Sequence, residues 1–382
     1  MDFKLNDEQL MIQEMARKFA KSELEPYAAE WDEEAKFPRD AVMKMGELGM
    51  MGILMPKELG GAGLDMLSYA LILEEISAGC ASTGVTMSVQ NSLFLGPILK
   101  YGTEEQKKKY IPDWAKGKKI GAFALSEADA GSDAANQRTT AVLDGDHYIL
   151  NGSKNFITSG SVADGFIVFA MTDINKGHRG ISAFIVENTF DGFQVGSIEK
   201  KLGIRGSPTT EIVLDGCKVP KENLMIGEGA GFKVAMGTLD SGRVGIATQA
   251  LGIAKAAFEV AAQYANVRIA FGKPIGAFQG IQWKIADMAT QIDAARMLVH
   301  RAAWLKDQGK PFSREGAMAK LFASEVSMNV TKEAIQVLGG YGYCKSHPVE
   351  RFYRDAKITE IYEGTSEVQR IVIARDVMKQ FS

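Results

Sequence analysis

One glutamate near the end of the chain, Glu363, has neighbours that suit acid–base chemistry. It lies between Tyr362 and Gly364 in the run Ile-Tyr-Glu-Gly-Thr-Ser at residues 361–366. A carboxylate can remove a proton beside a carbonyl group, and burial in an apolar pocket raises its pKa toward the working range. Most glutamates are solvated, however. The rest of the chain therefore has to decide between a catalytic base and a surface charge.

Three further stretches carry groups that could hold a ligand. Residues 125–133 (Leu-Ser-Glu-Ala-Asp-Ala-Gly-Ser-Asp) combine hydroxyls with a glycine, so backbone N–H groups there could reach a phosphate or a heteroaromatic ring. Residues 151–160 predict a turn followed by a strand with Phe156 and Thr158 on one face. Arg268, near the end of a predicted helix, could clamp a phosphate. Taken alone, the first stretch fits a plain polar turn about as well, whereas an ordinary hairpin and a surface ion are the better interpretations of the other two.

The bulk composition argues against several classes of protein. The chain has 382 residues with 44 basic and 47 acidic side chains, and the net charge of −3 argues against a nucleic-acid binder. The three cysteines are far apart and odd in number, which suits a reducing compartment. The four histidines are too scattered for metal-ligand spacing, so we expect no metal. No dinucleotide GxGxxG, Walker A or GxSxG motif is present.

The start of the chain gives an expectation about location. Residues 1–10 are acidic and run directly into a helical pattern, whereas a signal peptide has a basic start and an apolar core. No window approaches the roughly 20 apolar residues that a membrane span needs. The sequence therefore predicts a cytoplasmic protein without a membrane span.

Hydrophobic periodicity divides the chain into three regions. Residues 1–120 show helical patterns and predict an N-terminal α-helical domain. Residues 121–230 contain short β-rich runs, such as 165–170 and 180–186, and predict a central β-domain. Helical periodicity returns in residues 231–382, which predict a bundle of long antiparallel helices. The expected fold class is α+β, mainly helical.

Two helix starts can be predicted from their capping residues. Asn6 and Gln9 have the spacing of a capping box before the first amphipathic helix. Ser313 is expected to cap a later helix that ends near Gly339 and Gly340.

Taken together, five motifs in order along the chain resemble the acyl-CoA dehydrogenase family. They lie at residues 125–133, 154–158, 268–274, 336–343 and 361–370. Residues 84–93, 201–207 and 359–367 are most similar to its short-chain, butyryl-CoA-type branch. The resemblance implies a helical domain, a central β-barrel-like domain and a C-terminal four-helix bundle. It also implies FAD and a homotetramer in which each flavin touches a neighbouring subunit.

The resemblance also implies the residues that bind the cofactor. Ser126 and Thr158 would hydrogen-bond the flavin ring, and Phe156 would lie beside it. On one subunit the set is Phe123, Leu125, Ser126, Ser132, Phe156 and Thr158; on the neighbouring subunit it is Arg268, Phe271, Gln279, Gln336, Gly339 and Gly340; Thr365 and Glu367 complete it.

In the same comparison Glu363 is the catalytic base, which removes the α-proton of an acyl thioester while the β-hydrogen leaves as hydride. Its backbone N–H would bind the thioester carbonyl. Other branches of the family place the base at the position of Gly242, which has no side chain here. Glu363 is therefore the only carboxylate at either of the family's two base positions. The implied substrate contacts are Ser132, Asp240, Arg243, Tyr362 and Gly364.

The resemblance predicts the dehydrogenation of a short acyl-CoA in fatty-acid β-oxidation, with electrons passed to electron-transfer flavoprotein. A glutaryl-type enzyme would have an arginine at Gly84, and no basic residue occurs between Glu75 and Lys100. Branched or alicyclic substrates and the reverse reaction, enoyl-CoA reduction, use the same residues and stay open. So do an acyl-CoA oxidase, disfavoured by the short chain, and a non-dehydrogenating relative that binds a partner or DNA.

Overall fold

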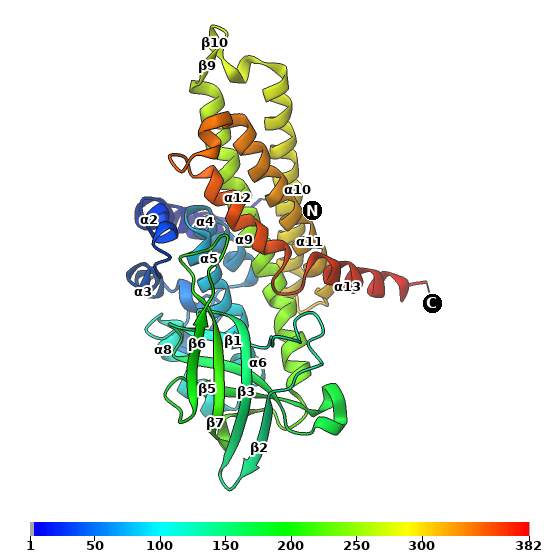
Figure 1. Cartoon of the computed structure of the whole chain (residues 1–382). Helices are drawn as coiled ribbons and strands as arrows, with labels where there is room; N and C mark the ends of the chain where they lie inside the picture. The colour runs from blue at the N-terminus through cyan, green and yellow to red at the C-terminus, as the bar shows by residue number, and fades with distance from the viewer. Residues whose placement is uncertain (1–3, 382) are drawn as a thin grey trace.

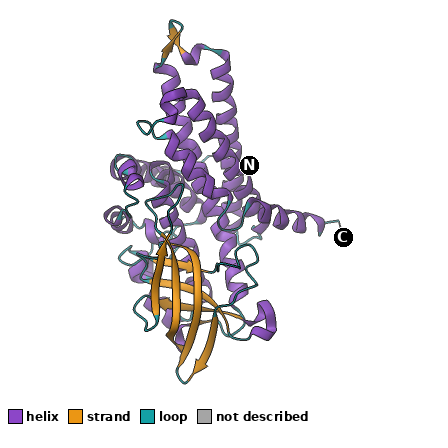
Figure 2. Cartoon of the chain, viewed as in Figure 1, coloured by secondary structure: helices purple, strands orange, loops and turns teal. Residues whose placement is uncertain are grey.

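The computed structural model, which describes residues 4–381, places a β-sheet beside short N-terminal helices and below a bundle of long helices (Figures 1 and 2). The sequence-based prediction of a mainly helical α+β fold is thus confirmed.

The N-terminal region consists of short helices arranged around one buried helix. They are α1 (Asp7–Phe19), α2 (Ala28–Glu33), α3 (Arg39–Glu47), α4 (Met66–Gly79), α5 (Ala81–Ser88), α6 (Gly96–Tyr101), α7 (Glu104–Tyr110) and α8 (Pro112–Ala115). The Asn6 side chain accepts a hydrogen bond from the Gln9 N–H, and the Gln9 side-chain oxygen accepts one from the Asn6 N–H, so the predicted capping box is present. Almost every residue of α4 is buried, because α1, α5, α9 and α10 pack around it.

The central region is one eight-stranded sheet. Its strands are β1 (Gly121–Ala124), β2 (Thr140–Asp144), β3 (His147–Thr158), β4 (Gly165–Met171), β5 (Ile181–Glu187), β6 (Phe193–Ile198), β7 (Thr209–Pro220) and β8 (Leu224–Met225). They pair in the order β6-β7-β3-β2-β4-β5-β8, and β1 pairs in parallel with β4. All seven residues of β4 are buried. Within residues 4–381 no ladder joins β6 to β8, so the barrel-like sheet is open.

The C-terminal region is built on one very long helix. The helices are α9 (Gly231–Val267), α10 (Gln279–Asp307), α11 (Ser313–Leu338), α12 (Val349–Lys357) and α13 (Ser366–Met378); the hairpin of β9 (Ile269–Ala270) and β10 (Lys273–Pro274) forms the tip between α9 and α10. By length and composition α9 could cross a membrane, contrary to the sequence-based expectation, but 78% of its apolar window is buried inside the protein. Its apolar residues therefore form the core of the bundle.

Ser313 does not have the predicted capping role. It is the first residue of α11, Phe312 occupies the N-cap position, and no side chain caps this helix. The Ser313 hydroxyl instead donates to Asp240 Oδ1 at 2.7 Å. Tertiary contact with α9 thus takes the place of the local cap.

Two buried carboxylates of α4 join the N-terminal helices to the bundle. Glu75 pairs with Arg17 of α1 at 2.9 Å and with Lys255 of α9 at 2.6 Å, and Glu74 pairs with Arg296 of α10 at 2.9 Å. Removing one partner would leave a buried charge unpaired, which is strongly destabilising. These pairs fix the position of α4 relative to α1, α9 and α10.

Gln90 connects the N-terminal helices to the first strand. Its side chain is fully buried; it donates to the carbonyls of Trp114 at 2.7 Å and Lys119 at 3.1 Å, and it accepts from the Gly121 N–H at 2.7 Å. The Gln90 side-chain amide therefore supplies hydrogen-bond partners for three backbone groups in the segment that leads into β1.

Replacing Gln90 by Leu should lower the free energy of unfolding by about 2–4 kcal/mol, because buried backbone groups lose their partners. Urea denaturation measures the effect. The exposed edge-strand variant Gln194→Leu should stay within about 0.5 kcal/mol of the wild type. Equal stabilities of the two variants would contradict this view of Gln90.

Candidate active site

Glu363 lies in the tight turn between α12 and α13, in the left-handed backbone conformation with φ of 53°. The next residue, Gly364, also has positive φ, 94°, which only glycine adopts readily. Thr365 then caps α13, since its hydroxyl accepts from the Val368 N–H at 3.3 Å. The Glu-Gly-Thr run therefore reverses the chain and starts the last helix, and it turns Glu363 toward the interior.

The Glu363 carboxylate is desolvated. Its Oε2 atom is buried and has no hydrogen-bond partner among residues 4–381. Burial raises the pKa of Glu363 from an ordinary value near 4.5 to about 7, and the nearby charges of Lys320 and Arg243 oppose that rise. Such a group changes between acid and base near neutral pH, as a general base requires.

Gly242 of α9 provides the space for this carboxylate. A Cβ atom at Gly242 would lie 2.0 Å from Glu363 Oε2 and 3.0 Å from Leu93 Cδ2. The structure therefore places the position of Gly242 directly opposite Glu363. A side chain at Gly242 and the present position of the carboxylate exclude each other.

Two tyrosines stand close to Glu363 and stay neutral. The Tyr362 hydroxyl donates to the Gln249 side chain, which in turn donates to the Ala81 carbonyl at 2.9 Å. The Tyr69 hydroxyl donates to Ser88 Oγ at 3.0 Å. Burial raises the pKa of both phenols well above the usual value, so the charges near Glu363 are cationic.

Arg243 and Asp240 form a pair one turn apart on α9, with 2.6 Å between Nη1 and Oδ1. Arg243 is buried, and its Nε has no hydrogen-bond partner within the described chain. The pair is thus part of the interior near Glu363 and could donate to a ligand. Ser132, predicted to share the substrate contacts, is exposed in the loop that follows β1.

The predicted flavin contacts of the β-domain come from two adjacent segments. The Asn155 N–H donates to the Ser126 carbonyl at 2.9 Å. The fully buried Lys154 donates to the Leu125 carbonyl at 3.3 Å and pairs with Glu127 at 2.7 Å. These contacts hold the two segments side by side. The predicted residues on them are Phe123, Leu125 and Ser126 on and after β1, and Phe156 and Thr158 on β3.

A bulge in β3 exposes one aromatic ring of this set. The pairing of β3 with β7 shifts register between Lys154 and Ile157, and Phe156 within the bulge has φ of 58° and is 65% exposed. The sequence predicted a regular strand with Phe156 and Thr158 on one face. In the structure the strand is interrupted at Phe156 by the bulge. The bulge instead presents the Phe156 ring at the surface.

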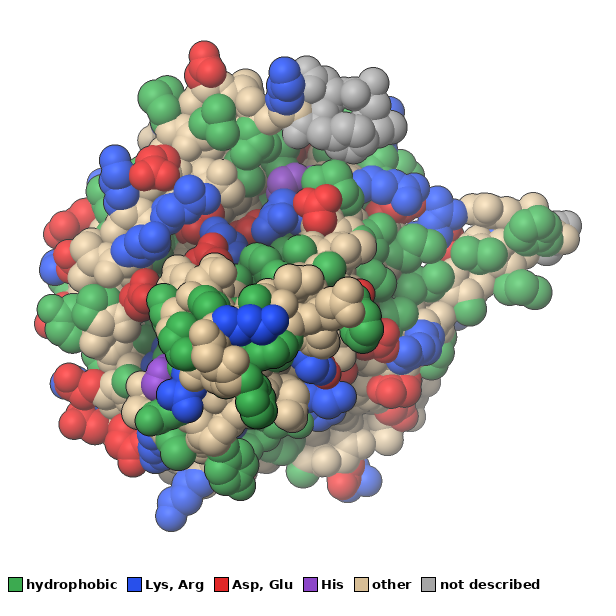
Figure 3. Space-filling model, turned by 90° about the horizontal axis from the view of Figure 1, so that it is seen from above, with side chains coloured by type: hydrophobic (Ala, Val, Ile, Leu, Met, Phe, Trp, Pro, Cys, Tyr) green, Lys and Arg blue, Asp and Glu red, His purple; other side chains and the backbone are tan. Residues whose placement is uncertain are grey.

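The second predicted set lies at the far end of the bundle. Arg268, Gly339 and Gly340 line one surface hollow with Tyr341, whose ring is 5.7 Å from the Arg268 guanidinium. Phe271, at the tip, is 95% exposed, and Figure 3 looks onto this end of the molecule. Gln279 and Gln336 are also exposed, and so is Glu367, which lies in α13 beside the Glu363 turn.

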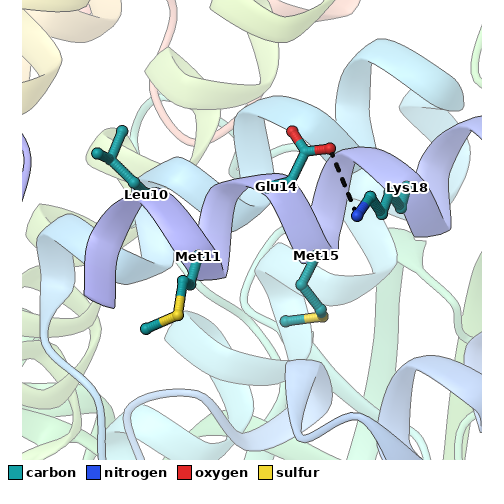
Figure 4. A pocket seen from close by; sticks show the side chains of 5 residues that line it. All are labelled: Leu10, Met11, Glu14, Met15 and Lys18. Atoms are coloured by element: carbon teal, nitrogen blue, oxygen red, sulfur yellow. Dashed lines mark ion pairs between the residues drawn. The ribbon is translucent and has the colours of Figure 1, made fainter. Parts of the chain in front are cut away.

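The structure does not bring the two sets together in one chain. The β9–β10 tip and the sheet lie at opposite ends of the molecule (Figure 1). Another shallow hollow, on α1, is lined by Leu10, Met11, Glu14, Met15 and Lys18, with an ion pair of 3.8 Å between Glu14 and Lys18 (Figure 4). It contains none of the predicted site residues.

Comparison with known proteins identifies this arrangement. Acyl-CoA dehydrogenase N-terminal, middle and C-terminal domains match residues 6–118, 122–217 and 229–378. The chain belongs to the acyl-CoA dehydrogenase family. A short-chain-specific acyl-CoA dehydrogenase of Clostridium acetobutylicum is 55% identical over 379 residues, 99% of this chain and 100% of the relative. The family resemblance seen in the sequence is thus confirmed, and the protein is an oxidoreductase.

Solved structures of relatives agree with the fold throughout the chain. The butyryl-CoA dehydrogenase of Megasphaera elsdenii superposes with a TM-score of 0.97 at 47% identity, covering 99% of this chain and 100% of that chain. A chain from a structure described as the electron transferring flavoprotein of Acidaminococcus fermentans superposes with a TM-score of 0.98 at 53% identity, covering 99% of both.

Sequence reasoning missed Lys320, Gln249 and Gln369, which surround the Glu363 turn. Lys320 is a single lysine among alanines on an apolar helix face, a pattern that could have indicated a buried amine. Gln249 and Gln369 gave no comparable signal, because their partners are distant in the sequence or are backbone carbonyls.

Replacing Gly242 by Ala should destabilise the protein by about 1–3 kcal/mol, although Ala is the better helix former, because the new methyl overlaps the Glu363 carboxylate. Thermal unfolding measures the change. Gly280→Ala in α10 is the matched control, since nothing lies within 4 Å of a Cβ there and the substitution should be neutral or stabilising. Equal Tm values for the two variants would refute the close approach.

Glu363→Gln should be more stable than the wild type at alkaline pH. Because the folded-state pKa is raised, the wild type loses stability as pH rises from about 4.5 through about 7, while the neutral amide does not titrate. Urea denaturation should show the variant's advantage growing by on the order of 1–3 kcal/mol between pH 5 and pH 8. An advantage that does not change with pH would contradict the desolvation of Glu363.

Proposed function

We propose that this protein is an FAD-dependent dehydrogenase that converts a short-chain acyl-CoA, such as butyryl-CoA, to the trans-2-enoyl-CoA and passes the electrons to electron-transfer flavoprotein. One observation carries the proposal: the Glu363 carboxylate has a buried oxygen without a hydrogen-bond partner and a pKa of about 7, and it occupies the space left by the missing side chain of Gly242. The short-chain-specific relative supports the substrate class, and the match to the electron transferring flavoprotein structure supports the partner.

The residues present fit FAD. On the β-domain an exposed Phe156 ring and the half-buried Ser126 and Thr158 offer an aromatic face and hydroxyls. At the far end of the bundle, Gly339 and Gly340 have no atom within 4 Å of an added Cβ, so a nucleotide can approach their backbone. Arg268 in the same hollow can bind pyrophosphate.

In the reaction Glu363 removes the proton from the α-carbon of the thioester. FAD, when bound, supplies the acceptor for the β-hydrogen as hydride. The Glu363 N–H donates to no group among residues 4–381 and is free to bind the thioester carbonyl as negative charge develops there. We assign Tyr362 and Gly364, the neighbours of Glu363 in the chain, to the acyl group. An acyl group bound there would keep water, which would lower the pKa of Glu363, away from the carboxylate.

The buried Arg243 and its partner Asp240 lie on α9 near this point, and we assign them, together with Ser132, to the CoA ester. The unpartnered Arg243 Nε can donate to an oxygen of the substrate. Tyr69 of α4 lies close enough to Glu363 to feel its charge, and its hydroxyl donates to Ser88 of α5 at 3.0 Å. The preference for a short acyl group rests on the short-chain-specific relative.

The separation of the two cofactor sets implies a neighbouring subunit, and we propose the homotetramer expected from the resemblance. Apolar side chains are exposed at the bundle tip, where Phe271 is 95% and Ile269 56% exposed. Helix α13 projects from the side of the molecule (Figure 1) and leaves Ile371 63% and Met378 67% exposed. Contacts between copies would cover these surfaces. A cytoplasmic location is part of the same proposal.

A dicarboxylic substrate would need a cation at the end of the acyl pocket. Gly84, the position of the arginine in glutaryl-type enzymes, is buried in α5, and a Cβ there would lie 2.3 Å from Ser77 Oγ. A side chain at this position would have to displace the Ser77 hydroxyl, and Gly84 itself supplies no cation for a second carboxylate.

The test is anaerobic mixing of the purified protein with butyryl-CoA while the flavin absorbance is followed. We expect rapid bleaching for the wild type and a rate lower by about 10²–10⁴-fold for Glu363→Gln, the usual contribution of a general base. Glu47→Gln, at the exposed end of α3, should react like the wild type.

Other outcomes would revise or refute the proposal. Bleaching only by isobutyryl-, cyclohexanecarboxyl- or glutaryl-CoA would keep the chemistry and overturn the substrate. Bound flavin that no thioester reduces would indicate a non-dehydrogenating relative. Normal turnover by Glu363→Gln would exclude Glu363 as the base.

A further inference from the structure

Two buried side chains hold the backbone that carries the base. Gln369 of α13 donates through Nε2 to the Gly364 carbonyl at 2.7 Å and to the Glu363 carbonyl at 3.4 Å. Lys320 of α11 donates through Nζ to the same Gly364 carbonyl at 2.8 Å. Both side chains are completely buried. The turn is thus fixed from two helices.

This turn needs such support, because its conformation is strained. Glu363 has φ of 53°, a region that costs a residue with a Cβ on the order of 1–3 kcal/mol and persists only when the surroundings enforce it. Hydrogen bonds to the carbonyls on both sides of the Glu363–Gly364 junction restrict the rotation of that peptide. They therefore restrict the directions of the Glu363 carboxylate and N–H as well.

A lysine is an unexpected choice if its purpose is only to satisfy a carbonyl. A buried ammonium pays a large desolvation penalty, and the hydrogen-bond partner of Lys320 is neutral. The carboxylate of Glu363 stands close enough to attract the ammonium, and this attraction acts in a low-dielectric interior. Burial lowers the pKa of Lys320 to about 8, so near neutral pH the lysine gives the turn a positive charge as well as a hydrogen bond.

We propose that Lys320 is a positioning residue for the base: through the Gly364 carbonyl it fixes the Glu363 turn, and through its charge it keeps the Glu363 carboxylate ionised at working pH. Gln369 contributes the geometry without the charge. The inference rests on the proposed function and deepens it, because it assigns the direction of the Glu363 carboxylate and its ionisation to different neighbouring groups.

Other charged and titratable groups also act on this pair, and the experiment keeps them in place. The groups that face Glu363 or Lys320 from the surrounding elements are Tyr69 of α4, Arg243 of α9, Glu360 and Tyr362 before the turn, and Glu367 of α13. Arg243 is the second cation near Glu363, so removal of Lys320 leaves one positive neighbour.

The experiment measures the pH dependence of flavin reduction by butyryl-CoA for Lys320→Met, Lys320→Gln and Gln369→Leu. Loss of the Lys320 charge makes ionisation of Glu363 harder. The acidic limb of the pH–rate profile should therefore move to higher pH by about one unit in both lysine variants, so that at acidic pH the rate is about tenfold lower than in the wild type. Lys320→Gln keeps a hydrogen-bond donor, so it still tests the loss of the charge if Lys320→Met does not fold. Gln369→Leu should lower the rate at all pH values by about tenfold without moving the limb.

A matched control separates these effects from general loss of stability. Gln106 is likewise buried and donates to two backbone carbonyls, those of Glu222 at 2.7 Å and Leu224 at 3.0 Å, away from Glu363. Gln106→Leu should lower Tm but leave the rate and its pH profile unchanged. Hydrogen exchange of residues 361–366 should accelerate in Gln369→Leu and stay unchanged in Gln106→Leu.

Failure of the inference is distinguishable from failure of the proposed function. A wild type that butyryl-CoA does not reduce refutes the function. A wild type that is reduced, together with Lys320→Met or Lys320→Gln whose acidic limb stays in place, overturns the role of Lys320.

Discussion

Burial of one carboxylate oxygen without a hydrogen-bond partner is the constraint on which the site depends. In water a glutamate has too low a pKa to be a strong base at neutral pH, and desolvation corrects this at a cost in stability. The folded chain has to supply that free energy from elsewhere. It does so through the packing of α9 against α11 and through the hydrogen bonds of the buried Lys320 and Gln369 to the Glu363 turn. Function and stability are therefore opposed at this residue.

The opposing requirement is that the carboxylate must still ionise. Two cations, Lys320 and Arg243, lower the pKa of Glu363 and so oppose the rise that burial causes. Two neutral phenols, Tyr69 and Tyr362, add no negative charge that would raise it further. Gly242 leaves the space that the carboxylate occupies. The site is thus a balance between burial and positive charge, set by helices that the rest of the fold, including the buried ion pairs of Glu74 and Glu75, holds in register.

The sequence predicted local features and whole-chain similarity well. Helical periodicity and the Asn6 capping box are local patterns, and the family resemblance supplied the order of helices, sheet and bundle. Ser313 was predicted wrongly because a contact with Asp240, 73 residues away, replaced the cap. Lys320 and Gln369 could not be predicted, since a one-letter sequence does not show which backbone carbonyl a buried donor will reach. The bulge at Phe156 is likewise set by the partner strand.

The most direct test is an infrared titration of the Glu363 carboxyl group in the wild-type protein, isolated by subtracting the spectrum of Glu363→Gln at each pH. The structure predicts that the protonated carboxyl band disappears with a midpoint near pH 7. A midpoint near 4.5, the value of a solvated glutamate, would show that the carboxylate is hydrated and would contradict the account of Glu363 as a desolvated base.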